Sequence, residues 1–326
     1  MNKKTISTMI KGGLLIVIAI VSTYFYMDYS EKYPTTEDAY VNADLLYIAP
    51  KVSGYVTGVS VTNNQFVHKG DTLFKIETDD YSVQLSQEQQ AQKYAEEQLA
   101  NAKTQISTAN ANLENAKVNY NALSDQLNRY TKMQSVNAAS LDTLQKYQTQ
   151  FAQAKATLEQ NKNNLVAAKI QVAAATAKVL QAQASVQNAK NHVGYTDIIA
   201  PSDGYVSNLS LVRGQYVSSG QQLFGLIDSN NWWIDANYKE TEIEQVKIGQ
   251  PVDITLDIYK HVHYKGIVQS ISYASGSTFS LMPAQNATGN WVKVTQRFTI
   301  RVQVQNSAQF PLRVGASARA KINTSL

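Results

Sequence analysis

Two histidines, His261 and His263, are the residues in this sequence whose type and spacing best suit a chemical role. They flank Val262, so a strand places both imidazoles on one face, as in a metal-binding pair. A zinc site needs three or four ligands. The chain has no cysteine, and its other histidines, His68 and His192, lie far away in the sequence. We therefore expect a surface pair, with no metal site and no cofactor.

Other signatures of catalysis are also missing from the sequence. It shows no Ser/His/Asp set, no glycine-rich phosphate loop and no suitably spaced pair of carboxylates, so we predict that the protein is not an enzyme. The formal net charge is only +4 over 326 residues, and no lysine- and arginine-rich block is interleaved with aromatic residues. This argues against a nucleic-acid partner. The absence of cysteine fits a location in the cell envelope.

An uncharged apolar segment near the N-terminus is short for a membrane span but can still form one. From Gly12 to Met27 it spans about 24 Å as a helix, against a hydrocarbon layer of roughly 30 Å. The lysines before it are Lys3, Lys4 and Lys11. The positive-inside rule therefore predicts a cytoplasmic tail over residues 1–10, an anchor over 11–28 and an external body. A cleaved signal peptide is the alternative, but bulky aromatic residues stand where small ones are needed.

The middle of the chain, residues 79–196, carries a seven-residue apolar repeat. One set of positions holds Leu85, Leu99, Ile106, Leu113, Tyr120 and Leu127, with Ala95, Ala102, Ala109, Ala116, Leu123 and Tyr130 beside them. After a break near 135–140 the repeat continues in Leu144, Phe151, Leu158, Leu165, Val172, Val179, Val186 and Val193, accompanied by Ala154, Ala168, Ala175, Ala182 and Ala189. This pattern predicts two coiled-coil helices of about 75 to 80 Å each. We expect one antiparallel hairpin projecting as a thin arm; a coiled-coil dimer of two chains is the alternative.

The segments on either side of this arm are copies of each other. Residues 35–78 contain the first copy and residues 197–228 the second, and Gly54 aligns with Gly204 as Gly70 aligns with Gly220. Alternating β-branched residues and turn residues predict short strands. A half of this size cannot bury its own apolar face, so we expect the copies to pack into one β-sandwich. We expect Gly54 and Gly204 to adopt turn conformations open only to glycine.

Beyond the second copy, residues 229–326 read as alternating strands separated by turns, which predicts an antiparallel β-barrel domain. The predicted fold class is thus α+β. A long loop in this domain carries four apolar residues, Phe279, Leu281, Met282 and Trp291. Loops of that length are usually functional or disordered. We expect either a docking surface for a partner or a plug packed on the barrel.

Several strings in the sequence resemble a known family. The copied halves are similar to the biotinyl/lipoyl carrier fold, without its modified lysine. A lipoyl-like sandwich, split by a helical hairpin and following a single anchor, resembles the membrane fusion proteins, the periplasmic adaptors of the HlyD superfamily. TEDAYV from Thr36, WWIDANYKETEIEQVKIGQPV from Trp232 and STFSLMPAQNATGNWVKVTQR from Ser277 resemble motifs of its EmrA-like multidrug export branch.

The resemblance implies partners and a location. It implies the adaptor of a tripartite multidrug efflux pump, with an EmrB-like proton-driven transporter of the major facilitator superfamily in the inner membrane and a TolC-type channel in the outer membrane. It also implies a homo-oligomer with single-pass anchoring in the inner membrane and a periplasmic body. The alternatives are an adaptor of an ATP-driven secretion system and an anchored coiled-coil scaffold with no transport role.

The hairpin tip is where the resemblance places channel docking. Family members that dock on TolC-type channels carry Arg, then Leu and Ser at the spacing that Arg129, Met133 and Ser140 show here. Met in place of Leu conserves volume and keeps an apolar side chain. A purely local interpretation makes Arg129 a solvated cation at a helix end and Ser140 the N-cap of the second helix.

Overall fold

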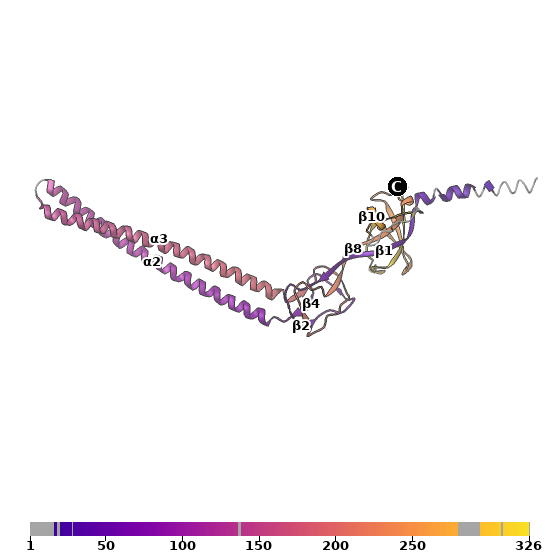
Figure 1. Ribbon diagram of the computed structural model, residues 1–326, viewed down its shortest axis with the longest axis horizontal. Helices are drawn as coiled ribbons and strands as arrows, with labels where there is room; N and C mark the ends of the chain where they lie inside the picture. Colours follow the sequence, from indigo (N-terminus) through magenta and orange to yellow (C-terminus); the bar gives the residue numbers. More distant parts are fainter. Residues whose placement is uncertain are drawn as a thin grey trace, which may run out of the picture.

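The computed structural model describes residues 16–17, 20–27, 29–135, 138–279, 294–307 and 309–325. Figure 1 shows an elongated molecule in which a helical hairpin, a β-sandwich and a ring of β-strands follow one another along the long axis. The predicted combination of a long helical hairpin with β-sheet domains is confirmed.

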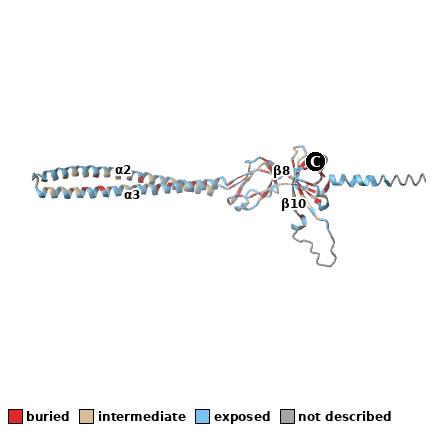
Figure 2. Ribbon diagram, turned by 90° about the horizontal axis from the view of Figure 1, so that it is seen from above, coloured by how far each residue is buried: buried red, intermediate tan, exposed pale blue. Residues whose placement is uncertain are grey.

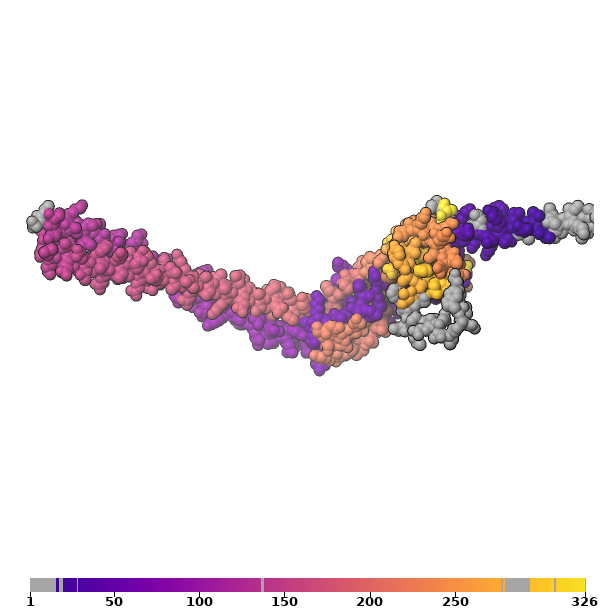
Figure 3. All heavy atoms as spheres, turned by 45° about the horizontal axis from the view of Figure 1, so that its top comes forward, coloured from indigo at the N-terminus to yellow at the C-terminus, as the bar shows by residue number. Residues whose placement is uncertain are grey.

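The hairpin consists of α2 (Asp79–Ser135) and α3 (Leu141–Gly194), 57 and 54 residues long. At 1.5 Å per residue each helix is roughly 80 Å long, and the pair extends far beyond the sandwich (Figures 1 and 3). Exposed residues cover most of its surface, with buried ones between the helices (Figure 2). All of those buried residues occupy predicted heptad positions: Ala102, Ala116, Ala154, Leu158, Ala175, Val179, Val186 and Ala189. The seam is therefore satisfied within one chain, without a second one.

The sandwich interlocks the two copied halves. The first half supplies β2 (Gly54–Val59), β3 (Phe66–Val67) and β4 (Thr72–Ile76), and the second half supplies β5 (Asp197–Ile199), β6 (Gly204–Ser207) and β7 (Tyr216–Val217). β2 pairs with β7, β3 with β6 and β4 with β5. The equivalent side chains Phe74 and Phe224 meet in the shared core, with ring centroids 6.1 Å apart. Each half thus lends its strands to the other, and neither half is complete alone.

The ring contains six antiparallel strands. In spatial order they are β1 (Thr35–Ile48), β12 (Ser317–Ile322), β9 (Pro251–Leu256), β10 (Tyr259–Ser275), β11 (Arg297–Val304) and β8 (Phe224–Lys239), and β8 pairs back with β1. Along β8, Ile234, Ala236 and Tyr238 are fully buried inside the ring, so the residues between them face outward. Short 3-10 helices follow β8 and β10 at Glu240–Glu242 (η1) and Gly276–Phe279 (η2).

Two strands run through both the sandwich and the ring. β1 and β8 stay paired from Ile48 and Phe224 in the sandwich to Ala39 and Ala236 in the ring, with one irregularity near Asp44. The domain boundary expected at 228/229 therefore falls inside β8. The copied sequence ends at Asp228, but β8 continues beyond it and stays paired with β1.

The predicted anchor lies only partly within the described residues. Residues 20–27 are helical and exposed, and the chain stays helical from 29 to 32 before it enters the ring. At that entry the rings of Tyr29 and Tyr33 lie 4.8 Å apart, and the Lys321 ammonium lies 4.8 Å from each ring centroid. This contact ties the helix end to β12.

Candidate functional site

The hairpin tip holds the three predicted channel-docking residues on consecutive elements. Arg129 and Met133 are four residues apart near the end of α2, which places them on one face of that helix. Both are exposed; 42% of Met133 is accessible to solvent. Ser140 caps α3 by accepting a hydrogen bond from the Asp142 amide at 3.3 Å. The N-cap predicted for Ser140 is confirmed.

Aromatic pairs stiffen the helix ends just below the tip. The rings of Tyr130 and Tyr147 stack at 4.3 Å, and those of Tyr120 and Phe151 lie 5.1 Å apart. Hydrogen bonding of the Tyr130 hydroxyl to Tyr147 and the electrostatic influence of Tyr147 raise the pKa of the Tyr130 hydroxyl. Among the described residues, no carboxylate forms an ion pair with Arg129. The Arg129 guanidinium is thus exposed to solvent near the end of α2, where the aromatic pairs hold α2 against α3.

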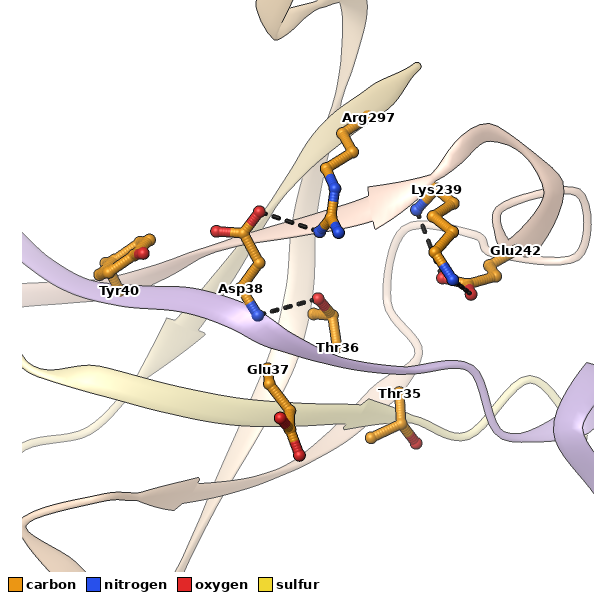
Figure 4. A pocket seen from close by; sticks show the side chains of 8 residues that line it. All are labelled: Thr35, Thr36, Glu37, Asp38, Tyr40, Lys239, Glu242 and Arg297. Atoms are coloured by element: carbon orange, nitrogen blue, oxygen red, sulfur yellow. Dashed lines mark hydrogen bonds and ion pairs between the residues drawn. The ribbon is translucent and has the colours of Figure 1, made fainter. Parts of the chain in front are cut away.

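A second cluster forms where the family-like strings meet. Figure 4 shows a polar pocket at one end of the ring, lined by residues of β1, β8, η1 and β11. Asp38 comes from TEDAYV, Lys239 and Glu242 from the string that begins at Trp232, and Arg297 ends the third string. Strings more than 190 residues apart in sequence therefore converge, because β8 lies between β1 and β11 in the ring.

Asp38 is the centre of this pocket. Its carboxylate accepts hydrogen bonds from Arg297 at 2.9 Å and from the Asn237 amide at 3.2 Å. Thr299 donates to the Asn237 side-chain oxygen at 2.7 Å, and Lys239 pairs with Glu242 at 3.3 Å. Beneath them, burial raises the pKa of the Tyr238 hydroxyl far above its ordinary value. These charges are paired with one another, so the pocket offers a recognition surface rather than a free base or nucleophile.

A second polar cluster lies further along β1, β8 and β11, around Asp235. The Asp235 carboxylate accepts from the Asn42 amide at 2.7 Å, from the Trp233 indole at 3.0 Å and from Arg301 at 3.5 Å. The Arg301 guanidinium also lies 4.4 Å from the Trp233 ring centroid. We call the Asp38 and Asp235 clusters together the polar ladder.

We expect Asp235→Ala to destabilise the ring by about 1 to 2 kcal/mol. The substitution leaves three donors without their shared acceptor, in a site where only 25% of the Asp235 side chain is exposed. Equilibrium unfolding followed by tryptophan fluorescence measures the loss. Asp235→Asn, which keeps an acceptor but removes the charge, should cost less; an unchanged free energy of unfolding in Asp235→Ala would contradict the prediction.

The histidine pair lies on β10. His263 approaches Asp253 of β9 at 3.2 Å, and both side chains are more than half exposed. Within the described ranges, no group of three or more His, Cys, Asp or Glu side chains is placed to hold a metal. Three of the four predicted transporter-docking residues, Leu281, Met282 and Trp291, lie outside the described residues, as does the side chain of Phe279.

The four predicted glycines divide into two kinds. Gly70 and Gly220 have φ of +94° and +79°, in the left-handed region that favours glycine. Gly204 has no positive φ; a Cβ there would collide with the main-chain oxygen of Ile227. At Gly54 a Cβ would meet the Ile76 side chain at 2.6 Å. The expectation of a glycine-only turn is therefore wrong at Gly204, where close packing against β8 excludes a side chain.

An interlocked sandwich that carries a long helical hairpin and shares two strands with a closed ring is the architecture of a membrane fusion protein. Residues 45–229 match the family model described as RND MFP, barrel-sandwich hybrid domain. The chain is 34% identical to the multidrug export protein EmrA of Haemophilus influenzae, covering 96% of this chain and 82% of that protein. It is 33% identical to EmrA of Escherichia coli K12, over 89% of this chain and 76% of that protein.

One further relative and one solved structure are also similar to this chain. The colistin resistance protein EmrA of Acinetobacter baumannii is 30% identical, over 95% of this chain and 92% of that one. A solved structure of the periplasmic adaptor protein EmrA aligns with a TM-score of 0.48 at 20% identity, over 90% of this chain and 99% of that chain. The chain belongs to the membrane fusion protein family, as an EmrA-like adaptor. Proteins of this family are adaptors and not enzymes.

Proposed function

We propose that this chain is the periplasmic adaptor of a tripartite multidrug efflux pump. Its partners in this proposal are an EmrB-like major facilitator transporter in the inner membrane and a TolC-type channel in the outer membrane. The observation that carries the proposal is the roughly 80 Å hairpin, exposed along its whole length and built on a sandwich tied to the ring. An arm of this length serves to reach a distant partner. The names of the relatives support drug export.

The transporter would be contacted at the end of the ring from which the N-terminal helix leaves. There, Tyr26 and Glu31 of the helix line a pocket with Thr241, Glu242 and Gln245 around η1. The polar ladder begins beside η1, and Leu281, Met282 and Trp291, the predicted transporter-docking residues, lie between β10 and β11 in the sequence. We place the transporter contact on these elements.

A homo-oligomer is supported by the outer surface of the hairpin. α3 exposes Val166, Ile170 and Leu180, which are 55%, 65% and 61% accessible. Among the described residues, α3 is also the one helix that is long and apolar enough to cross a membrane, by length and composition alone. It pairs instead with α2 along the hairpin.

The two helices also differ in charge near the sandwich. Between 160 and 194, α3 carries four lysines and no carboxylate, whereas α2 carries five carboxylates and one lysine between 79 and 97. The apolar stripe and the opposite charges suit side-by-side packing of copies, α3 against the next α2.

Coexpression with an EmrB-like transporter tests the proposal. In a strain that lacks its own EmrA-type adaptor, the chain and the transporter together should restore drug resistance, and the chain should copurify with the transporter. Replacing 85–190 by a short Gly-Ser linker should abolish resistance while copurification persists. Resistance that survives without the hairpin would refute the adaptor role.

We expect the chain to stay in the inner membrane with its body in the periplasm. The exposed apolar side chains of the N-terminal helix include Ile20, Val21 and Phe25, which are 63%, 47% and 66% accessible. A reporter active only in the periplasm, fused after Leu326, should be active and should sediment with membranes. A soluble active fusion that begins near Tyr24 would instead demonstrate signal-peptide cleavage.

A further inference from the structure

The outer surface of the ring carries a group of basic side chains on β9, β10 and β12. The residues on either side of Asp253 in β9 are buried, so the Asp253 side chain faces outward. Strand pairing places it directly opposite Lys265 of β10 and Lys321 of β12. Its carboxylate contacts the His263 imidazole at 3.2 Å. These four side chains, which we call the basic face, line a shared cleft of about 470 Å³.

The two lysines of the basic face have no carboxylate partner. Within the described ranges, neither Lys265 nor Lys321 forms an ion pair, although Asp253 lies on the strand between them. Lys321 instead donates a hydrogen bond to the Tyr29 hydroxyl, and its ammonium lies 4.8 Å from the ring centroids of Tyr29 and Tyr33. Each ammonium carries three donors, so both lysines can still donate to an added anion.

The N-terminal helix sets the height of the basic face above a membrane. Its apolar segment ends at Met27, and Tyr29 and Tyr33 follow two and six residues later. With an upright helix, these tyrosines lie about 3 and 9 Å beyond the hydrocarbon layer, where the headgroup layer is roughly 5 to 8 Å thick. Tyrosine is typical of this interface. Lys321 contacts both rings, so the basic face lies at the height of the lipid phosphates.

The opposite side of the same end of the ring is acidic. Beside η1, Glu31 of the N-terminal helix lines a pocket with Glu242 and Glu244. η1 follows β8, and β9 is three strands from β8 in either direction around the ring. The two sides therefore carry opposite charges. An anionic surface attracts the basic face and repels the side that carries η1.

We propose that the basic face binds the phosphate groups of anionic phospholipids in the outer leaflet of the inner membrane. Lys265 and Lys321 donate to the phosphate oxygens. The partner is the charged surface of the membrane, and only lipid headgroups take part in the contact. The inference rests on the membrane anchor of the proposed function and adds a second attachment. That attachment fixes which side of the ring faces the bilayer and leaves η1 accessible to the transporter.

Native mass spectrometry of the full chain in a neutral detergent, without transporter or channel, tests this inference. The first dioleoylphosphatidylglycerol should bind about 25-fold more tightly than dioleoylphosphatidylcholine, since each lysine near an anionic lipid contributes about fivefold in affinity. Lys265→Gln should weaken phosphatidylglycerol binding about fivefold and leave phosphatidylcholine binding unchanged. Asp253→Asn should strengthen phosphatidylglycerol binding about threefold, because it removes a repelling charge. Misfolding cannot produce such a gain.

Lys260→Gln is the matched control. It removes the same charge from β10 beyond the far end of β9, away from the N-terminal helix, and should retain the affinity. Equal affinities for the two lipids, or an equal loss in Lys260→Gln and Lys265→Gln, would overturn the inference. So would a preference that Lys265→Gln and Asp253→Asn both leave unchanged, which would assign it to the lysines before the apolar segment. A chain that is anchored in the membrane but shows no lipid preference refutes this inference alone.

Discussion

Gly204→Ala is expected to destabilise the sandwich by about 3 kcal/mol, a large loss for one methyl group. The new Cβ would lie against the main-chain oxygen of Ile227 and 3.3 Å from the Leu226 side chain. Gly204 pairs with Val67 on one side and with Asp228 on the other. No flexible side-chain end can move aside, so the backbones of β6 and β8 must separate.

Hydrogen exchange of the full chain measures this effect, because the hairpin would dominate a helical signal. Peptides from β2 to β4 and from β5 to β7 should lose protection together, since the halves interlock. Gly58→Ala is the matched control: a Cβ there meets nothing within 4 Å. If protection falls only in the second half, the two halves are independent folding units.

Arg129→Asp is expected to abolish drug resistance in cells while leaving the arm folded. The guanidinium is exposed at the end of a braced helix and can donate in a fork to carbonyl or carboxylate groups of a channel rim. Reversing its charge converts attraction into repulsion. Minimum inhibitory concentrations measure the loss, and circular dichroism and membrane abundance confirm that the variant is intact.

Lys103→Asp makes the same charge change on the same helix, 26 residues before the tip, and should retain resistance. Met133→Leu should also retain it, because volume and apolarity are conserved. Normal resistance in a well-expressed Arg129→Asp strain would show that the tip is not the docking site.

The heptad pattern was sufficient to predict two long coiled-coil helices, and the copied segments on either side favoured their pairing within one chain over a dimer. Its buried positions, such as Leu158 and Val179, are those the repeat designates. The break at 135–140 located the tip equally well, since Ser140 is a strong N-cap residue. Local rules therefore sufficed for this part of the fold.

Long-range pairing was less accessible to sequence reasoning. The repeat predicted two copies packed together, but not that β2 would pair with β7 and β3 with β6. Nor did it indicate that β8 would pass out of the sandwich into the ring. Such pairings depend on partners more than 100 residues away, and the local pattern of a strand is the same in either arrangement.

The polar ladder was missed, although the sequence contains its signal. Asp235, Asn237 and Lys239 alternate with buried residues, as Arg297, Thr299 and Arg301 do on β11. Asp235 and Arg301 form the one directly opposed pair of opposite charges among these positions, and a pair of that kind is a signal that two strands are neighbours in a sheet. The family-like strings indicate a family, but they do not identify which of their polar residues pair with one another in the fold.

The two strands shared by the sandwich and the ring also govern how the molecule bends. A single linker would allow free rotation, but β1 and β8 form an antiparallel two-stranded ribbon with two covalent connections side by side (Figure 1). Such a ribbon resists torsion and flexes across its plane, most easily at the irregularity near Asp44. The hairpin alone is a lever of roughly 80 Å, so a flexure of about 10° displaces the tip by at least about 14 Å. We therefore expect the tip to move mainly in one plane, so that its search for a partner follows an arc instead of filling a cone.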